Sequence, residues 1–259
     1  MLRLRNLGSG SSGNCTLVEA VADGGAITRL LVDCGLGIRV LERRLGAAGL
    51  AFSDLHALFI THEHSDHVGC ARALALRQRL PVWMSDGSWR ASGSHDYDGL
   101  LNVAVSGQPI ALDGLQIDPI AVPHDALEPL QLSCTDGNRK LAILTDLGHV
   151  PESVLNHLAG SHLLLLECNH EPDLLEASSY PAFLKRRVAG AHGHLANAQA
   201  ASALHELQHG GLRHVVAAHL SARNNRPELA RAALAQSLGA QSGDIVVADP
   251  VSGTGWLSA

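Results

Sequence analysis

Residues 61–67 read Thr61-His62-Glu63-His64-Ser65-Asp66-His67 and directly follow the apolar run Ala57–Ile60. Imidazole nitrogen and carboxylate oxygen are ligands that zinc, manganese and iron readily take up. Because His62, His64 and Asp66 alternate, a turn that leaves a strand can direct all three to one point. His67 falls outside this alternation, at the start of a predicted helix, and can serve a second ion. Four ligands this close exceed the needs of one open catalytic ion, so the heptad predicts two metal ions a few ångströms apart.

Other polar residues follow apolar strands elsewhere in the chain. They are Asp33, His124, Asp146, Glu167 and His219. In α/β proteins, functional side chains gather on loops at one edge of the sheets. We therefore expect His124, Asp146 and His219 to be metal ligands together with the heptad. Asp33 and Glu167 are expected to hold ligands from behind or to cap helices.

The composition argues against a generally basic nucleic-acid-binding protein, a disulfide-rich protein and a membrane-spanning protein. A formal net charge of −6 and a pI near 6.2 provide no overall basic field, so nucleic acid would have to bind through a local patch and bound cations. The five cysteines lie singly, without a Cys-x-x-Cys pair, which favours reduced thiols in the cytoplasm over a disulfide framework. We find no signal peptide and no apolar run that could cross a membrane. The sequence predicts no oligomeric state.

Hydrophobic periodicity predicts a β-rich beginning, an alternation of helices and strands, and a β-rich end. The expected strands are residues 2–7, 15–20, 27–33, 57–61, 81–84, 101–105, 115–122, 129–135, 140–145, 162–168, 214–219, 244–249 and 254–258. The expected helices are residues 38–49, 66–79, 151–159, 172–189, 197–209 and 226–238. Residues 85–100 are expected to be irregular. This order indicates two packed sheets with helices outside, within a single domain that spans residues 1–259.

The THxHxDH motif, followed by strand-end His, Asp and His residues, resembles the metallo-β-lactamase superfamily. Further segments resemble its YycJ-like (WalJ-like) branch. They are GSGSSGN at 8–14, LVDCG at 31–35, VPHDA at 122–126, LAILTD at 141–146, ECNH at 167–170, YPAFLKRR at 180–187, GHLAN at 193–197 and AHLSARNN at 218–225. The resemblance covers nearly the whole chain. It implies an αββα four-layer sandwich, with two mixed sheets flanked by helices.

The resemblance also implies a metal arrangement. One ion would be held by His62, His64 and His124, and the other by Asp66, His67 and His219, with Asp146 bridging the two. The ions would be zinc or manganese. His170 and His149 remain alternatives to His124 as the third ligand of the first ion.

Two residues are expected to take part in catalysis. Asp66 would orient a metal-bound hydroxide as well as bind metal. His194 occupies the place of the histidine that ribonuclease Z-like relatives use beside the scissile phosphate, and an imidazole can donate a proton to the leaving group near neutral pH. The nearby His192 is the alternative to His194.

The expected substrate is a phosphodiester. The backbone N–H groups of the GSGSSGN turn can hold a phosphate, so Ser11, Ser12 and Asn14 are candidate substrate-binding residues, although a plain hairpin loop would have the same sequence. Basic residues at 185–187, 223 and 226 can contact a nucleic-acid backbone. The resemblance favours a DNA exonuclease. The alternatives are an RNA-processing nuclease, a glyoxalase II-like thioester or lactone hydrolase, and a binding module without activity.

Overall fold

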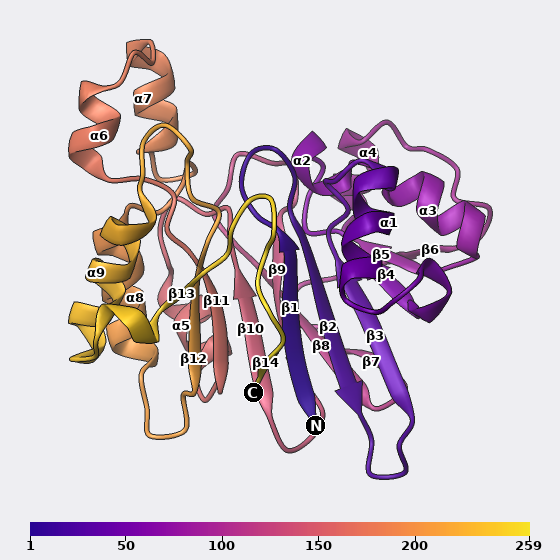
Figure 1. Ribbon diagram of the computed structural model, residues 1–259. Coiled ribbons are helices and arrows are strands. Elements are labelled where there is room, and N and C mark those ends of the chain that lie inside the picture. Colours follow the sequence, from indigo (N-terminus) through magenta and orange to yellow (C-terminus); the bar gives the residue numbers. More distant parts are fainter.

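A pair of seven-stranded sheets forms the centre of the computed structural model, which describes residues 1–259 (Figure 1). In the first sheet the order is β14 (Leu257–Ser258), β1 (Leu2–Gly8), β2 (Cys15–Val21), β3 (Ile27–Val32), β4 (Ala57–Phe59), β5 (Val82–Met84) and β6 (Leu101–Val103). In the second it is β13 (Val246–Val247), β12 (His214–Ala218), β11 (Leu163–Glu167), β10 (Lys140–Leu144), β9 (Leu130–Thr135), β8 (Leu115–Ala121) and β7 (Ile110–Leu112). Both sheets contain parallel and antiparallel pairs.

Helices cover the outer faces of the two sheets (Figure 1). The α-helices are α1 (Ile38–Ala47), α2 (Ser65–Val68), α3 (Ala71–Gln78), α4 (Asp86–Ala91), α5 (Glu152–Leu158), α6 (Pro172–Ala177), α7 (Ala182–Val188), α8 (Asn197–Leu207) and α9 (Pro227–Leu238). Two 3₁₀ turns, η1 (Phe52–Asp54) and η2 (Ser242–Asp244), complete the regular elements. None of the helices is long and apolar enough to cross a membrane.

Three clusters of buried apolar side chains hold the sheets and helices together. Successive side chains of a strand point to opposite faces of the sheet, so the leucines of β11 belong to two different clusters. Leu163 and Leu165 pack against the other sheet, whereas Leu164 and Leu166 pack beneath α5, α8 and α9. A third cluster lies between the first sheet and the helices α1 and α3. The expected αββα sandwich is therefore confirmed.

Parallel pairing decides where the polar strand ends meet. Strands β3, β4 and β5 run parallel in the first sheet, as do β10, β11 and β12 in the second. The carboxyl ends of parallel strands lie at the same edge of a sheet. The loops after β3, β4, β10, β11 and β12 therefore emerge at the same edge of the sandwich, near α2 (Figure 1).

Several expected elements differ from the structure. The single helix predicted for residues 66–79 is wrong, because α2 ends at Val68 and α3 starts at Ala71. Gly69 separates them with φ +23°, and a Cβ there would lie 2.4 Å from the carbonyl oxygen of Cys34, so the chain bends to pass close to the end of β3. Helices α6 and α7 are likewise separate.

Residues 85–100 are not wholly irregular. They contain α4, whose Ser85 hydroxyl caps the helix by accepting a hydrogen bond from the Ser88 N–H. Strand β7 was not expected either. It is a three-residue edge strand, too short to give a periodic signal.

Candidate metal centre

Three of the polar residues at strand ends have a left-handed backbone. Asp33 and His219 directly follow β3 and β12, and Asp146 follows β10 after one residue, Thr145. The φ values of Asp33, Asp146 and His219 are +61°, +56° and +55°. Such a conformation is uncommon for residues other than glycine, although Asp and His tolerate it better than most. It turns each chain sharply at the edge of its sheet. Asp146 and His219, each 2% exposed, lie 3.3 Å apart, and Asp33 is buried behind His67.

A first cluster contains His62, His64 and His124. Nε2 of His62 lies 3.1 Å from Nδ1 of His64, and the ring centroid of His124 lies 5.0 Å from that of His62 and 5.1 Å from that of His64. Each ring presents a nitrogen within 4.8 Å of the others, close enough to share one metal ion. Nε2 of His124 is buried without a hydrogen-bond partner, which fits a ring nitrogen that can bind a metal ion.

A second cluster contains Asp66, His67 and His219. Oδ2 of Asp66 lies 3.6 Å from Nε2 of His67 and 3.7 Å from Nε2 of His219. The Nε2 atom of His219 is also buried without a partner. These three side chains form a second group that could hold an ion.

Asp146 lies between the two clusters. Its Oδ2 atom is 3.3 Å from Nε2 of His67. The residue also forms a group that could hold an ion with His62 and His67, one from each cluster. Oδ2 is buried and accepts no hydrogen bond. A buried carboxylate oxygen without a partner is costly, so an electropositive partner between the clusters fits this arrangement.

Two further carboxylates orient the rings from behind. Oδ2 of Asp33 lies 2.8 Å from Nδ1 of His67, while Oδ1 accepts the Thr61 N–H. Oε1 of Glu167 lies 3.0 Å from Nδ1 of His219. When Nδ1 donates to a carboxylate, the other ring nitrogen is left as an unprotonated metal ligand. Asp33 and Glu167 thus lie where the sequence placed them, behind candidate ligands.

The clusters differ in their charge. Burial lowers the pKa of His67, but the carboxylates of Asp146 and Asp33 outweigh this effect and raise it to about 9. Burial likewise opposes protonation of His219, and Asp146, Asp66 and Glu167 together raise its pKa. The pKa values of His62 and His124 are lowered, chiefly by burial. Without metal, the raised pKa values favour protonated His67 and His219, and a metal cation could replace these protons.

His194 lies beside both clusters. Its ring centroid is 5.3 Å from those of His124 and His219, and its Nδ1 lies 2.8 Å from Oε1 of Glu167. Burial lowers the pKa of His194, but Glu167 outweighs it and the pKa is raised. The side chain is 23% exposed, so a substrate can approach the ring.

The alternative histidines lie elsewhere. Nδ1 of His149 contacts the carbonyl oxygen of Ala191, and His192 is exposed. His170 is buried but joins none of the groups that could hold an ion. Of these candidates, His124 is the one that groups with His62 and His64.

The residues of the GSGSSGN turn differ in exposure: its serines at 11 and 12 face solvent, whereas Asn14 lies against the second cluster. Ser11 and Ser12 are exposed. Asn14 is buried, and its Nδ2 lies 2.9 Å from Nε2 of His67 and 3.2 Å from Oδ2 of Asp66. Its Oδ1 accepts the Gly10 N–H, so Asn14 connects the turn to the second cluster.

Sequence reasoning did not assign three residues of this region. The Thr61 hydroxyl lies 3.0 Å from both carboxylate oxygens of Asp33 and 3.0 Å from Nδ1 of His62. Asp125 forms an ion pair with Arg187, and its Oδ1 is 3.4 Å from Nε2 of His124. Gly35 lies so close to Asp66 that a Cβ would be 1.7 Å from its carbonyl oxygen. All three lie close in sequence to predicted ligands or strand ends, and this proximity is the sequence feature that could have identified them.

Known proteins resemble this chain over most of its length. Residues 28–220 match the family model described as the beta-lactamase superfamily domain. The chain is 34% identical over 236 residues to exodeoxyribonuclease YycJ of Bacillus anthracis, covering 90% of this chain and 87% of that protein. It is 29% identical to exodeoxyribonuclease WalJ of Streptococcus pneumoniae D39, covering 90% and 86%.

A solved structure shares the fold. The metallo-beta-lactamase fold protein YhfI from Bacillus subtilis aligns with a TM-score of 0.74 at 18% identity, covering 100% of this chain and 99% of that one. With both the family model and a relative at this identity covering most of its length, the chain belongs to the metallo-β-lactamase superfamily.

Proposed function

We propose that this protein is a dinuclear metal-dependent phosphodiesterase that removes nucleotides from the ends of DNA. The observation that carries the proposal is the convergence of two ligand clusters on Asp146, with unpartnered buried atoms on His124, Asp146 and His219. Nitrogen and oxygen donors without a thiolate suit zinc or manganese. His62, His64 and His124 would hold one ion, Asp66, His67 and His219 the other, and Asp146 both.

Bound ions would supply a hydroxide nucleophile at neutral pH and offset the charge that develops on the phosphate. Side chains of the protein would orient the attacking water and supply a proton to the leaving group. Asp66, which is 22% exposed at the open side of the second cluster, can accept a hydrogen bond from the attacking water and orient it. His194 can donate its Nε2 proton to the leaving oxygen, because Glu167 holds the Nδ1 side of the ring.

The choice of DNA rests on relatives and on local charge. Two relatives that align with most of this chain are named exodeoxyribonucleases. The net charge of −6 gives no general attraction for nucleic acid. However, α6 and α7 project from the edge of the sandwich that carries α2 (Figure 1). The last turn of α7 contains Lys185, Arg186 and Arg187, and Arg223 packs over the ring of Tyr180, which lies just before α7. Cations here could contact phosphates that extend away from the metal centre.

The first experiment tests the activity itself. We expect the metal-loaded protein to shorten end-labelled double-stranded DNA, and His64→Ala to lower the rate at least about 100-fold because the first ion loses a ligand. His95→Ala, which changes an exposed histidine outside the centre, should retain the wild-type rate. RNA and a thioester are assayed in parallel. Intact DNA with metal-dependent cleavage of either would contradict the proposal.

A second experiment tests the role of His194. A leaving alkoxide needs a proton, whereas p-nitrophenolate does not. We therefore expect His194→Asn to slow DNA hydrolysis by about 10²–10⁴-fold but hydrolysis of thymidine 5′-(p-nitrophenyl) phosphate far less. His192→Asn, which changes an exposed neighbour, should affect neither. Equal losses on both substrates in His194→Asn would rule out proton donation by this ring.

A third experiment uses the charge of the second cluster. Below a pH of about 9, His67 carries a proton that an ion must displace, so metal affinity at this cluster should rise with pH. The expected slope approaches tenfold per pH unit for each proton displaced. The first cluster, whose His62 and His124 have lowered pKa values, should load with a shallower dependence. Calorimetric titration between pH 6 and 8 measures both steps, and pH-independent affinity at both would contradict this assignment.

A further inference from the structure

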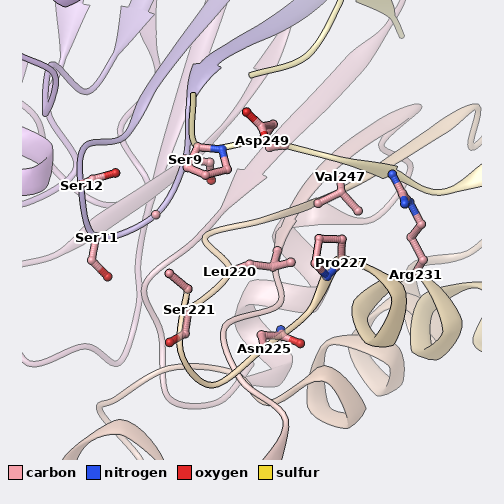
Figure 2. A pocket seen from close by; sticks show the side chains of 14 residues that line it. Ser9, Ser11, Ser12, Leu220, Ser221, Asn225, Pro227, Arg231, Val247 and Asp249 are labelled. Atoms are coloured by element: carbon pink, nitrogen blue, oxygen red, sulfur yellow. The ribbon is translucent and has the colours of Figure 1, made fainter. Parts of the chain in front are cut away.

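A cavity of about 500 Å³ is lined by Leu220 and Ser221, which directly follow the candidate ligand His219. Its walls come from the GSGSSGN turn, the segment after His219, the start of α9 and residues 247–250. Figure 2 shows Leu220, Pro227 and Val247 between the serines of the turn on one side and Arg231 on the other. Ser11, Ser12 and Ala222 are exposed at its mouth. Cavities of this size hold small molecules in many proteins.

Hydrogen bonds connect the lining of the cavity to residues of the second cluster. The Ser9 hydroxyl, which lines the cavity, accepts the His219 N–H at 2.7 Å. Gly10 also lines it, and its N–H donates to Asn14, whose Nδ2 lies 2.9 Å from Nε2 of His67. A group in the cavity would therefore lie one residue away from the backbone of His219 and two residues away from the ring of His67.

The lining combines apolar walls with unused donors. The backbone N–H groups of Ser11, Ser12 and Ala222 make no hydrogen bond within the protein. Arg231 donates only its Nε, to the carbonyl oxygen of Ile245 at 3.3 Å, which leaves the other guanidinium N–H groups available. Asp249, the single carboxylate of the lining, already accepts three hydrogen bonds on its Oδ1 from the turn that follows it.

Such a lining matches a nucleoside better than a bare anion. Leu220, Pro227 and Val247 offer surface to the faces of a heterocyclic base, and the free N–H groups and Arg231 can meet the oxygens of the base and sugar. A nucleoside is joined directly to its phosphate. Its pocket must therefore adjoin the centre at which the phosphate reacts, and this cavity does.

We propose that this cavity binds the nucleoside of the terminal nucleotide, while the adjoining phosphodiester lies at the metal centre. The inference rests on the proposed nuclease function. It adds a reason for action at ends, since a pocket of about 500 Å³ accommodates one nucleoside and not a continuing duplex. Ser11 and Ser12, expected to hold a phosphate, would instead contact the nucleoside.

The test compares two substrates that differ by the nucleoside. Ala222→Trp places an indole at the mouth of the cavity, and Ala26→Trp places one at an exposed position of the β2–β3 hairpin. For each variant, kcat/KM is measured with DNA and with methyl p-nitrophenyl phosphate, a phosphodiester without a nucleoside. We expect Ala222→Trp to lower kcat/KM for DNA at least about tenfold more than for the small diester. Ala26→Trp should leave both values at the wild-type level.

A measurement on the wild-type protein guards against misfolding of the variant. Thymidine monophosphate should inhibit hydrolysis of methyl p-nitrophenyl phosphate at least about tenfold more strongly than inorganic phosphate, because nucleoside contacts add to those of the phosphate. Equal inhibition by the two, or equal losses on both substrates in Ala222→Trp, would overturn the nucleoside site while leaving the nuclease intact. A wild-type protein that hydrolyses the small diester but not DNA would instead refute the proposed function.

Discussion

Two buried carboxylates, those of Asp33 and Glu167, hold the candidate metal centre together. A buried carboxylate must be paired with donors, and each of these is paired with backbone N–H groups and imidazole rings. Asp33 accepts from Thr61 and contacts His67. Glu167 accepts from the N–H groups of Leu147 and Leu195 and contacts His194 and His219. These contacts fix the ring orientations, so the outward nitrogens face a common space before any ion arrives.

The sheets supply the rigidity that this arrangement needs. A left-handed conformation at a residue other than glycine costs about 1–3 kcal/mol and persists only where surrounding structure enforces it. Asp33, Asp146 and His219 all have it. Asp33 and His219 directly follow β3 and β12, and Asp146 lies one residue beyond β10, whose residues Leu141–Leu144 are buried on both faces of the sheet. The packed αββα core thus stabilises a strained edge, at which Asp146 and His219 lie 3.3 Å apart and Asp33 supports His67 from behind.

The sequence predicted which ligand-type side chains lie together better than it predicted their surroundings. Ligand-type residues after apolar strands meet because parallel strands end at one edge, and this rule needs no tertiary detail. Asn14 and Thr61 could not be assigned in the same way, because their contacts depend on how loops from distant parts of the chain approach. The break at Gly69 has a similar origin, since it follows from the approach of α2 to the end of β3. The cavity beside Ser9 depends on the packing of segments more than 200 residues apart, which neither periodicity nor motif spacing encodes.

The central claim is that both clusters hold an ion and that Asp146 bridges them. The most direct measurement is a crystal structure of the manganese-loaded protein with anomalous scattering data. Our account predicts two anomalous peaks about 3.5–4 Å apart, one beside His62, His64 and His124 and one beside Asp66, His67 and His219, with Asp146 in contact with both. A single peak, or two peaks that do not share Asp146, would contradict it.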